Sequence, residues 1–171
     1  MTDNQYIFLS TISFIANQCP ERTVGFHKLS KILYFAEQKH LVKYGSKLTN
    51  DTFIAMQNGP VPSATYDILK NIRDYPEDVP NEIRNSFNVS RHYITSTVES
   101  DLDWLSESEI ECLNESILEN RDLSFIDLTN KSHDAAWRED IRMDTIKIAE
   151  AGGANEQIIA YIQSNLERTS Y

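Results

Sequence analysis

Hydrophobic residues recur every three or four positions between 26 and 44, and this spacing predicts a long helix with one buried face. The stripe consists of Phe26, Leu29, Leu33, Ala36 and His40, with Ile32 and Phe35 on either side. Four lysines fall off the stripe and are interpreted as the solvated face, namely Lys28, Lys31, Lys39 and Lys43. Thr23 is the predicted N-cap. Gly45 is the predicted stop, because glycine takes the left-handed conformation at little cost.

A strand and a rigid turn should follow this helix. The run 52–56 (TFIAM) is apolar and predicts a short, mostly buried strand. The segment 58–61 (NGPV), which we name the elbow, breaks it. Pro60 and Pro62 lack the N–H that a sheet ladder needs. Ser63 is the predicted cap of the next helix, which carries Tyr66 and reaches about residue 73.

A second strand is predicted at 91–98 (RHYITSTV), because this run alternates and is rich in β-branched and aromatic residues. An isolated pair of strands is marginal in water. We therefore expect this strand to pair with 52–56 in a minimal sheet that helices cover.

Capping signals mark further helices. Ser106 and Glu109 form a capping box before a helix that should reach about 120, and Ser124 begins a shorter one. Periodicity predicts helices at 5–17 and 155–166, and 81–86 should add a helical turn. The predicted fold is mainly α (α+β), a compact domain of about six helices with a small two- or three-stranded antiparallel β element. The whole chain, 1–171, is expected to be a single domain.

Composition narrows the setting of the protein. No apolar run approaches the ~20 residues that span a bilayer. The N-terminus lacks a basic stretch followed by an apolar core and a cleavage site. Cys19 and Cys112 are too few for a disulfide scaffold and suit a reducing compartment. These features predict a cytoplasmic protein that does not act at a membrane.

Negative charge is concentrated in one part of the chain. Residues 99–150 hold 15 acidic and 5 basic side chains, a difference that equals the whole net charge of −10. This balance argues against nucleic acid as a partner, because phosphate binding needs clustered lysine and arginine. The acidic block is interpreted as a solvated helix face that aids solubility. The alternative is that it attracts a basic partner or mimics nucleic acid.

The usual signatures of catalysis and metal binding are missing from the sequence. No two of the four histidines have the i, i+4 spacing of a helical zinc site, and neither cysteine has a second cysteine nearby. Both cysteines are interpreted as small buried residues. Gly59 stands alone rather than in a phosphate-binding glycine loop. The sequence therefore predicts no enzyme activity, no catalytic residues, no metal and no cofactor.

Two segments remain as candidates for binding, the elbow and 132–137 (SHDAAW). His133 and Trp137 share a face on a helical turn, and they form either a structural corner or part of a groove for another protein. The candidate partner-contact residues are Asn58, Gly59, Pro60, Val61, Tyr66, His133, Asp134 and Trp137. The residues taken as structural are Leu29, Leu33, Tyr34 and Ala36.

The order of these motifs resembles a known family. The run 28–36 (KLSKILYFA), His40, Tyr44-Gly45, the elbow and Tyr66 are similar to the SocA-like, or Panacea, antitoxin domain, which itself resembles phage-associated proteins of the GepA type. Toward the C-terminus the similar features are Leu105-Ser106, Ser132-His133 and Trp137. The resemblance covers about 23–166.

This resemblance implies an antitoxin of a bacterial or phage toxin–antitoxin system, which neutralises a cognate protein toxin by direct binding. It also implies an alternative, a mobile-element or phage-associated regulator that binds DNA or acts as an adaptor for a protease. The cognate toxin is thus the expected partner, and a protease the second candidate. The sequence leaves homo-oligomerisation and the identity of the toxin open.

Overall fold

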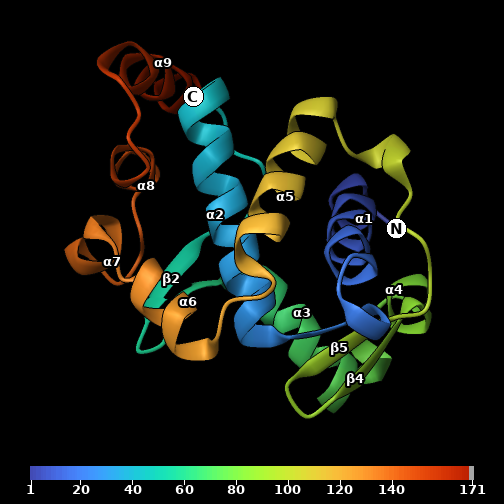
Figure 1. Ribbon diagram of the computed structural model, residues 1–171. Coiled ribbons are helices and arrows are strands. Elements are labelled where there is room, and N and C mark those ends of the chain that lie inside the picture. Colours follow the sequence, from blue (N-terminus) through green and yellow to red (C-terminus); the bar gives the residue numbers. More distant parts are fainter. Residues whose placement is uncertain (170–171) are drawn as a thin grey trace.

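The computed structural model describes residues 1–169, and for Glu139 the main chain alone. Helix α2 (Phe26–Tyr44) is the central element, and α5 (Glu107–Asn120) runs alongside it (Figure 1). Of the 19 residues of α2, 12 are buried, so this helix is covered on more than the one face that its stripe predicts. Leu29, Leu33 and Ala36 lie in the core as expected. Gly45 ends the helix with φ of 68°.

The other helices surround this pair. In Figure 1, α1 (Asp3–Asn17) lies to the right of α5, and α8 (Thr145–Ala151) and α9 (Glu156–Arg168) lie to the left of α2. The remaining helices are α3 (Ser63–Asp74), α4 (Asn81–Ser86), α6 (Phe125–Ser132) and α7 (Ala135–Glu139). Short 3-10 turns occupy Pro20–Arg22, Pro76–Asp78 and Leu102–Trp104. The mainly α prediction is confirmed. The described residues form nine α-helices rather than about six, because the chain between α5 and α9 breaks into short pieces.

Two predicted caps are wrong, and those at Ser106 and Ser124 are confirmed. Thr23 belongs to strand β1 (Thr23–Gly25), and α2 begins after Gly25 without a side-chain cap. Ser63 is the first residue of α3 rather than its cap. The Asp51 carboxylate caps this helix instead, and it accepts hydrogen bonds from Ala64 N and Thr65 N, both at 2.8 Å. The capping box at Ser106 forms as predicted.

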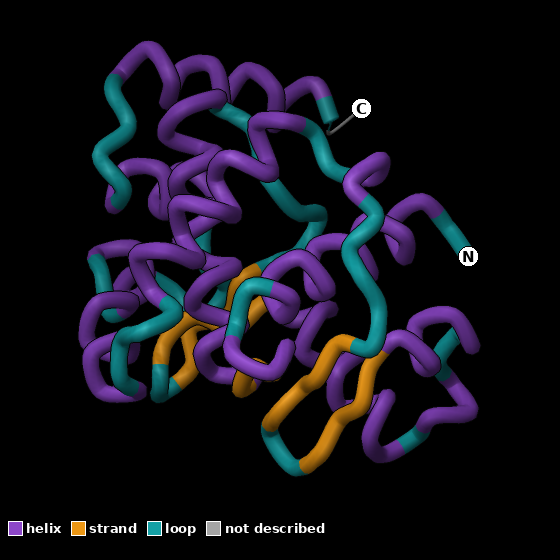
Figure 2. Tube along the Cα trace, turned by 45° about the vertical axis from the view of Figure 1, so that its right-hand side comes forward, coloured by secondary structure: helices purple, strands orange, loops and turns teal. Residues whose placement is uncertain are grey.

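The strands form two separate antiparallel sheets, seen as two groups in Figure 2. One has the order β1-β5-β4, with β4 at Phe87–Ser90 and β5 at Tyr93–Ser96. The other is the hairpin of β2 (Phe53–Met56) and β3 (Gly59–Pro62). The predicted pairing of 52–56 with 91–98 is therefore wrong, since β2 pairs with β3, and β5 pairs with β4 and β1.

The spacing of the prolines explains why the elbow can be a strand. Ser63 N donates to Thr52 O at 2.9 Å, which places the hydrogen-bonded pairs of the hairpin at every second position, including Ile54–Val61. Pro60 and Pro62 fall on the intervening pairs, where no N–H is needed toward β2. Two prolines at a spacing of two residues are thus compatible with a strand at a sheet edge.

The predicted solvated face of α2 is the largest departure from expectation. Lys31 is only 1% exposed, and Lys28 and Lys39 are half-buried, which leaves Lys43 as the exposed member. Glu37, on the same helix, is also 1% exposed. The hairpin β2–β3 covers Lys31, and the segment 47–53 covers Glu37. No helix among the described residues has the length and the apolar character needed to cross a membrane.

Candidate partner-binding surface

The elbow is held against α2 by a buried lysine. Lys31 Nζ donates a hydrogen bond to Pro60 O at 3.0 Å, beneath Gly59 and next to Ser132. Gly59 has φ of 108°, and a Cβ at this position would overlap Ser132 Oγ and lie 2.5 Å from Lys31 Cε. Glycine is therefore needed here for its conformation and for its lack of a side chain. Gly59 and Pro60 are buried and position the surface around them.

The burial of Lys31 changes the electrostatics of this region. Desolvation lowers the pKa of Lys31 from 10.5 to about 8. The prediction from sequence missed this residue, although its neighbours at i+3 and i+4 are Tyr34 and Phe35, two aromatic side chains in place of the carboxylates typical of an exposed lysine. That pattern is the signal that favoured burial.

The tip of the hairpin is clamped between three helices. The His27 ring nitrogen Nε2 lies 3.2 Å from Asn58 O and 3.0 Å from Thr129 Oγ1 of α6, and the ring stacks on Phe125 with centroids 3.8 Å apart. On the other side, Trp137 Nε1 donates to Met56 O at 2.9 Å. These contacts join α2, α6 and α7 to the hairpin, and the elements lie close together at the lower left of Figure 1.

The resulting surface presents aromatic and apolar side chains to solvent. Met56 and Phe125 are each 52% exposed, and Asn58 is exposed between them. We name this group, His27, Met56, Asn58, Phe125 and Trp137, the elbow surface. The pKa of His27 falls to about 4, because burial and then the nearby Lys31 ammonium disfavour its charged form. The imidazole is thus neutral near pH 7, and the centre of the elbow surface carries no charge of its own.

The structure brings some of the predicted contact residues together. Asn58 and Trp137 belong to the elbow surface, and His133 stacks on Trp137 with centroids 3.7 Å apart and planes 11° apart. Val61 is half-buried in β3. Tyr66 lies apart from this group, since it packs on α3 edge-on to Phe26, with ring centroids 6.0 Å apart, and beneath the Lys70 ammonium.

Asp134 has a structural role in addition to its predicted one. Its carboxylate accepts hydrogen bonds from the Tyr34 hydroxyl at 2.7 Å, Gln38 Nε2 at 3.3 Å and Trp137 N at 3.1 Å. It therefore caps α7 and fastens it to α2. Burial, followed by the Asp134 charge and hydrogen bond, raises the pKa of the Tyr34 hydroxyl. Tyr34 is buried, and its bond to Asp134 helps to fix the position of Trp137.

The acidic block is partly neutralised by the lysines of α2. Lys39 Nζ lies 2.9 Å from Glu119 Oε1, and Lys43 Nζ lies 2.8 Å from Glu111 Oε1 and also pairs with Glu115. One face of the acidic helix α5 therefore meets the basic face of α2 rather than solvent alone. The two charge patterns that the sequence shows separately are complementary in the fold.

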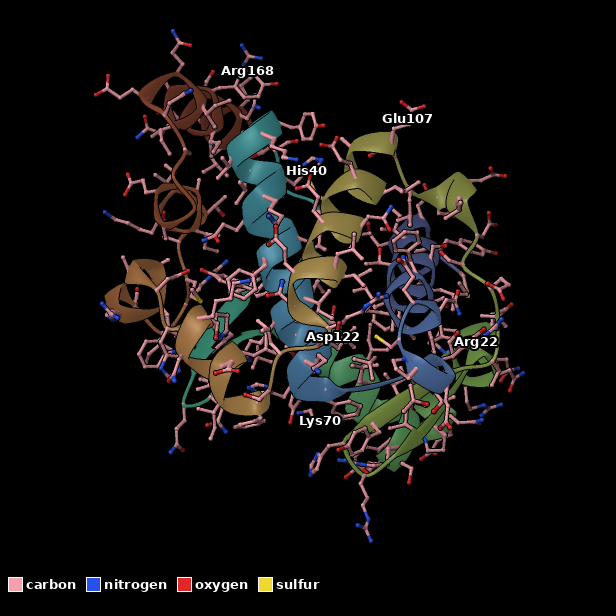
Figure 3. All side chains as sticks on the ribbon, viewed as in Figure 1. Arg22, His40, Lys70, Glu107, Asp122 and Arg168 are labelled. Atoms are coloured by element: carbon pink, nitrogen blue, oxygen red, sulfur yellow. The ribbon has the colours of Figure 1, made fainter. Side chains whose placement is uncertain are left out.

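The two cysteines and His40 are buried. Cys19 and Cys112 are both buried, and burial raises their thiol pKa values, to about 11 for Cys112. His40, labelled in Figure 3, contacts Ser46 O and Ser108 Oγ between α2 and α5. Among residues 1–169 there is no group of three or more histidine, cysteine and carboxylate side chains suited to a metal ion.

Comparison with known proteins identifies the family. The family described as antitoxin SocA-like, Panacea domain, matches residues 29–138, which is more than half of the chain. This range contains most of α2, the hairpin, α5, α6 and most of α7, and so includes nearly all of the elbow surface. No curated protein and no solved structure gives a significant match. The chain belongs to the family of SocA-like antitoxins that is defined by the Panacea domain.

Proposed function

We propose that this protein is an antitoxin that neutralises a cognate protein toxin by direct binding, and that the elbow surface is the centre of the contact. The family supports an antitoxin-like role with a protein as partner. The observation that carries the location is the exposed pair Met56 and Phe125 beside the half-buried Trp137, which three helices hold around one rigid hairpin.

The chemistry of the elbow surface suits a protein partner. Aromatic residues and methionine are enriched at protein interfaces, and tryptophan is a frequent centre of binding energy. The hydrogen bond to Met56 O holds the Trp137 side chain and the stack on His27 holds that of Phe125, so these two aromatic residues have little conformational freedom left to lose on association. Binding at this position would cover the active surface of the toxin by steric occlusion. In this proposal the protein binds its target and makes or breaks no covalent bond.

The DNA-binding alternative is less well supported. A DNA-binding face on α2 would need its four lysines, and each of them is already engaged. Lys39 and Lys43 pair with glutamates of α5, and Lys28 Nζ donates to Arg121 O at 2.5 Å. Lys31 is buried under the elbow. A partner that reads phosphates needs free cations on one face, and this helix does not offer them.

A co-expression experiment tests the proposal. The toxin candidate is the product of the open reading frame next to this gene, induced alone and together with this protein. We expect growth arrest in the first case and growth in the second, and the two purified proteins should elute together in gel filtration. A protease adaptor would instead restore growth only in cells that retain the protease, with loss of the toxin on immunoblots.

Two matched substitutions test the location of the contact. Phe125→Ala removes an exposed aromatic side chain from the elbow surface, and Leu118→Ala removes a side chain that is 64% exposed on α5. We expect Phe125→Ala to weaken toxin binding at least roughly tenfold, as is usual for an interface anchor, and Leu118→Ala to leave it unchanged. Calorimetric titration measures both, and thermal unfolding checks that each variant is folded. Equal affinities for the two variants would place the contact elsewhere.

A further inference from the structure

A cavity separate from the elbow surface lies on the side of α2 away from α5. It has a volume of about 500 Å³ and is formed by α2, the segment 47–53 and the stretch 140–148. We name it the Glu37 cavity. Leu41, Phe53 and Ile148 give it apolar walls, and charged side chains are placed between them. Its volume lies within the ~300–1,000 Å³ typical of small-molecule sites.

Glu37 is the residue that makes this cavity unusual. Its side chain is 1% exposed, and only one of its carboxyl oxygens has partners. Oε2 accepts hydrogen bonds from Leu48 N at 2.9 Å and Thr49 N at 2.8 Å, and so anchors the segment that follows α2. Among the residues that the structure describes, none is a hydrogen-bond partner of the buried Oε1. A buried carboxyl oxygen in this state is costly, and such an atom indicates a missing donor.

The charges around Glu37 favour a cation as that donor. The cavity is also lined by Asp51, Asp140 and Asp144, and its basic members are Lys47 and Arg142. Four carboxyl groups thus accompany two cations among the described residues of the lining, and those of Asp51, Asp140 and Asp144 also accept main-chain hydrogen bonds. Lys47 is engaged elsewhere, since its Nζ donates to Asp51 O at 2.7 Å. Burial raises the pKa of Glu37 to about 7, against the lowering effect of the Thr49 N–H and of Lys47, so that a cation nearby would restore its charged form.

We propose that the Glu37 cavity binds a small organic cation, an ammonium or guanidinium group on a short apolar stem, whose N–H donates to Glu37 Oε1. The stem lies against Leu41 and Ile148. A free amine and a lysine or arginine side chain of a partner protein both supply this group. Oε1 is buried, so the donor reaches it when a side chain that lines the cavity moves aside.

Thermal unfolding in the presence of model cations tests this site without any toxin, so its result is independent of the proposed function. The probes are butylguanidinium chloride and butylammonium chloride, with tetramethylammonium chloride as a cation of equal charge that has no N–H. At pH 8 we expect a saturable rise in Tm with the first two salts and none with the third. At pH 5.5 the apparent affinity should fall at least tenfold, because Glu37 is then protonated. The peptide acetyl-Gly-Arg-Gly-amide distinguishes the sources, since a partner side chain should bind best within a peptide.

Glu37→Gln is the decisive variant. The amide oxygen keeps the acceptor for Leu48 N and Thr49 N, while the charge and the free acceptor at Oε1 are lost. We expect its affinity for butylguanidinium to fall at least tenfold. The matched control is Glu82→Gln, the same change at an exposed position of α4 outside the cavity, which should bind as the unmodified protein does. The proposal is overturned if Glu37→Gln binds butylguanidinium equally well, if tetramethylammonium or magnesium chloride has a similar effect, or if no salt gives a saturable shift in Tm. Oε1 would then be left to a buried water.

Discussion

Two buried charged residues, Lys31 and Glu37, lie on α2 with no ion pair between them. Each is held by main-chain groups, Lys31 by Pro60 O and Glu37 by Leu48 N and Thr49 N. Removing a charge from water costs several kcal/mol unless hydrogen bonds and opposite charges offset it. These two residues therefore fasten the segments that follow α2, the loop at 47–51 and the elbow, at an energetic cost that the rest of the core must offset.

The pH dependence of stability provides a test for Lys31. Its pKa is about 8 in the folded protein, against 10.5 for a lysine side chain in water, so the unfolded chain holds the proton more tightly. Stability should therefore rise as the pH increases from about 8 to 10.5, by up to about 3 kcal/mol, since one pKa unit corresponds to about 1.4 kcal/mol. Lys31→Met should lack this rise.

Urea denaturation of both proteins at pH 7.5 and pH 10 measures the effect. The difference between the two proteins isolates Lys31, because the remaining lysines and tyrosines titrate in both. If the variant gains as much stability at high pH as the unmodified protein, Lys31 is not the group responsible.

The sequence predicted the burial of hydrophobic residues better than the burial of charged ones. Leu29, Leu33 and Ala36 are buried because their spacing follows the helical period, which is visible in one dimension. Lys31 and Glu37 were assigned to the surface or passed over, because their residue type favours exposure. Their burial depends on segments that arrive from other parts of the chain. For Lys31 the aromatic neighbours Tyr34 and Phe35 are a local signal of burial, whereas no local pattern specifies it for Glu37.

The hairpin β2–β3 is the element on which the elbow surface depends. Its turn requires Gly59 for two separate reasons, a φ of 108° and the close approach of Ser132 and Lys31. Gly59→Val should therefore lower the stability by at least about 3 kcal/mol, from the left-handed conformation and the steric overlap together. Thermal unfolding monitored by circular dichroism measures the loss.

Gly153→Ala separates these two causes. Gly153 also has a positive φ, 91°, but a Cβ there meets nothing within 4 Å. This variant should lose only the conformational part, about 1–2 kcal/mol. If both variants lose the same amount, the packing of Lys31 and Ser132 against the turn contributes nothing to stability.

Among the elements, the sequence located helices better than strand partners. The capping box at Ser106 is a local signal that fixes a helix start within a few residues, and α5 begins where it predicts. The pairing of 52–56 was wrong because two prolines were taken to exclude 59–62 from a sheet. Only the hairpin register, which puts Pro60 and Pro62 on pairs without hydrogen bonds toward β2, makes that strand possible.

The charges of the whole molecule are arranged so that α2 and α5 neutralise each other at their contact. The net charge of −10 therefore overstates how acidic the solvent-facing side of α5 is, since Glu111, Glu115 and Glu119 pair with Lys39 and Lys43. The mainly α class and the family were predictable from the sequence, because both depend on patterns along the chain. The Glu37 cavity and the part of the elbow surface formed by His27, Met56 and Phe125 were not, because each combines residues more than 65 positions apart.

The central position of α2 predicts that the whole chain unfolds as one unit. The two tryptophans report from different parts of the molecule. Trp104 stacks on Tyr6 of α1, with centroids 4.6 Å apart, and Trp137 lies on α7 beside the hairpin. Because α2 contributes to the core throughout its length, both regions should unfold together.

Two variants with one tryptophan each test this expectation. Trp104→Phe leaves Trp137 as the fluorescent probe, and Trp137→Phe leaves Trp104. Trp137→Phe also loses the hydrogen bond to Met56 O, so its urea midpoint should be lower. Within each variant, however, the midpoint from fluorescence should coincide with that from far-UV circular dichroism. A fluorescence transition that precedes the loss of helix would mean that the region around the remaining tryptophan unfolds separately. For Trp137 that region is α7 and the hairpin, and for Trp104 it is α1 and its neighbours. Separate unfolding of α7 and the hairpin would mean that the elbow surface is less rigid than toxin binding by a preformed site requires.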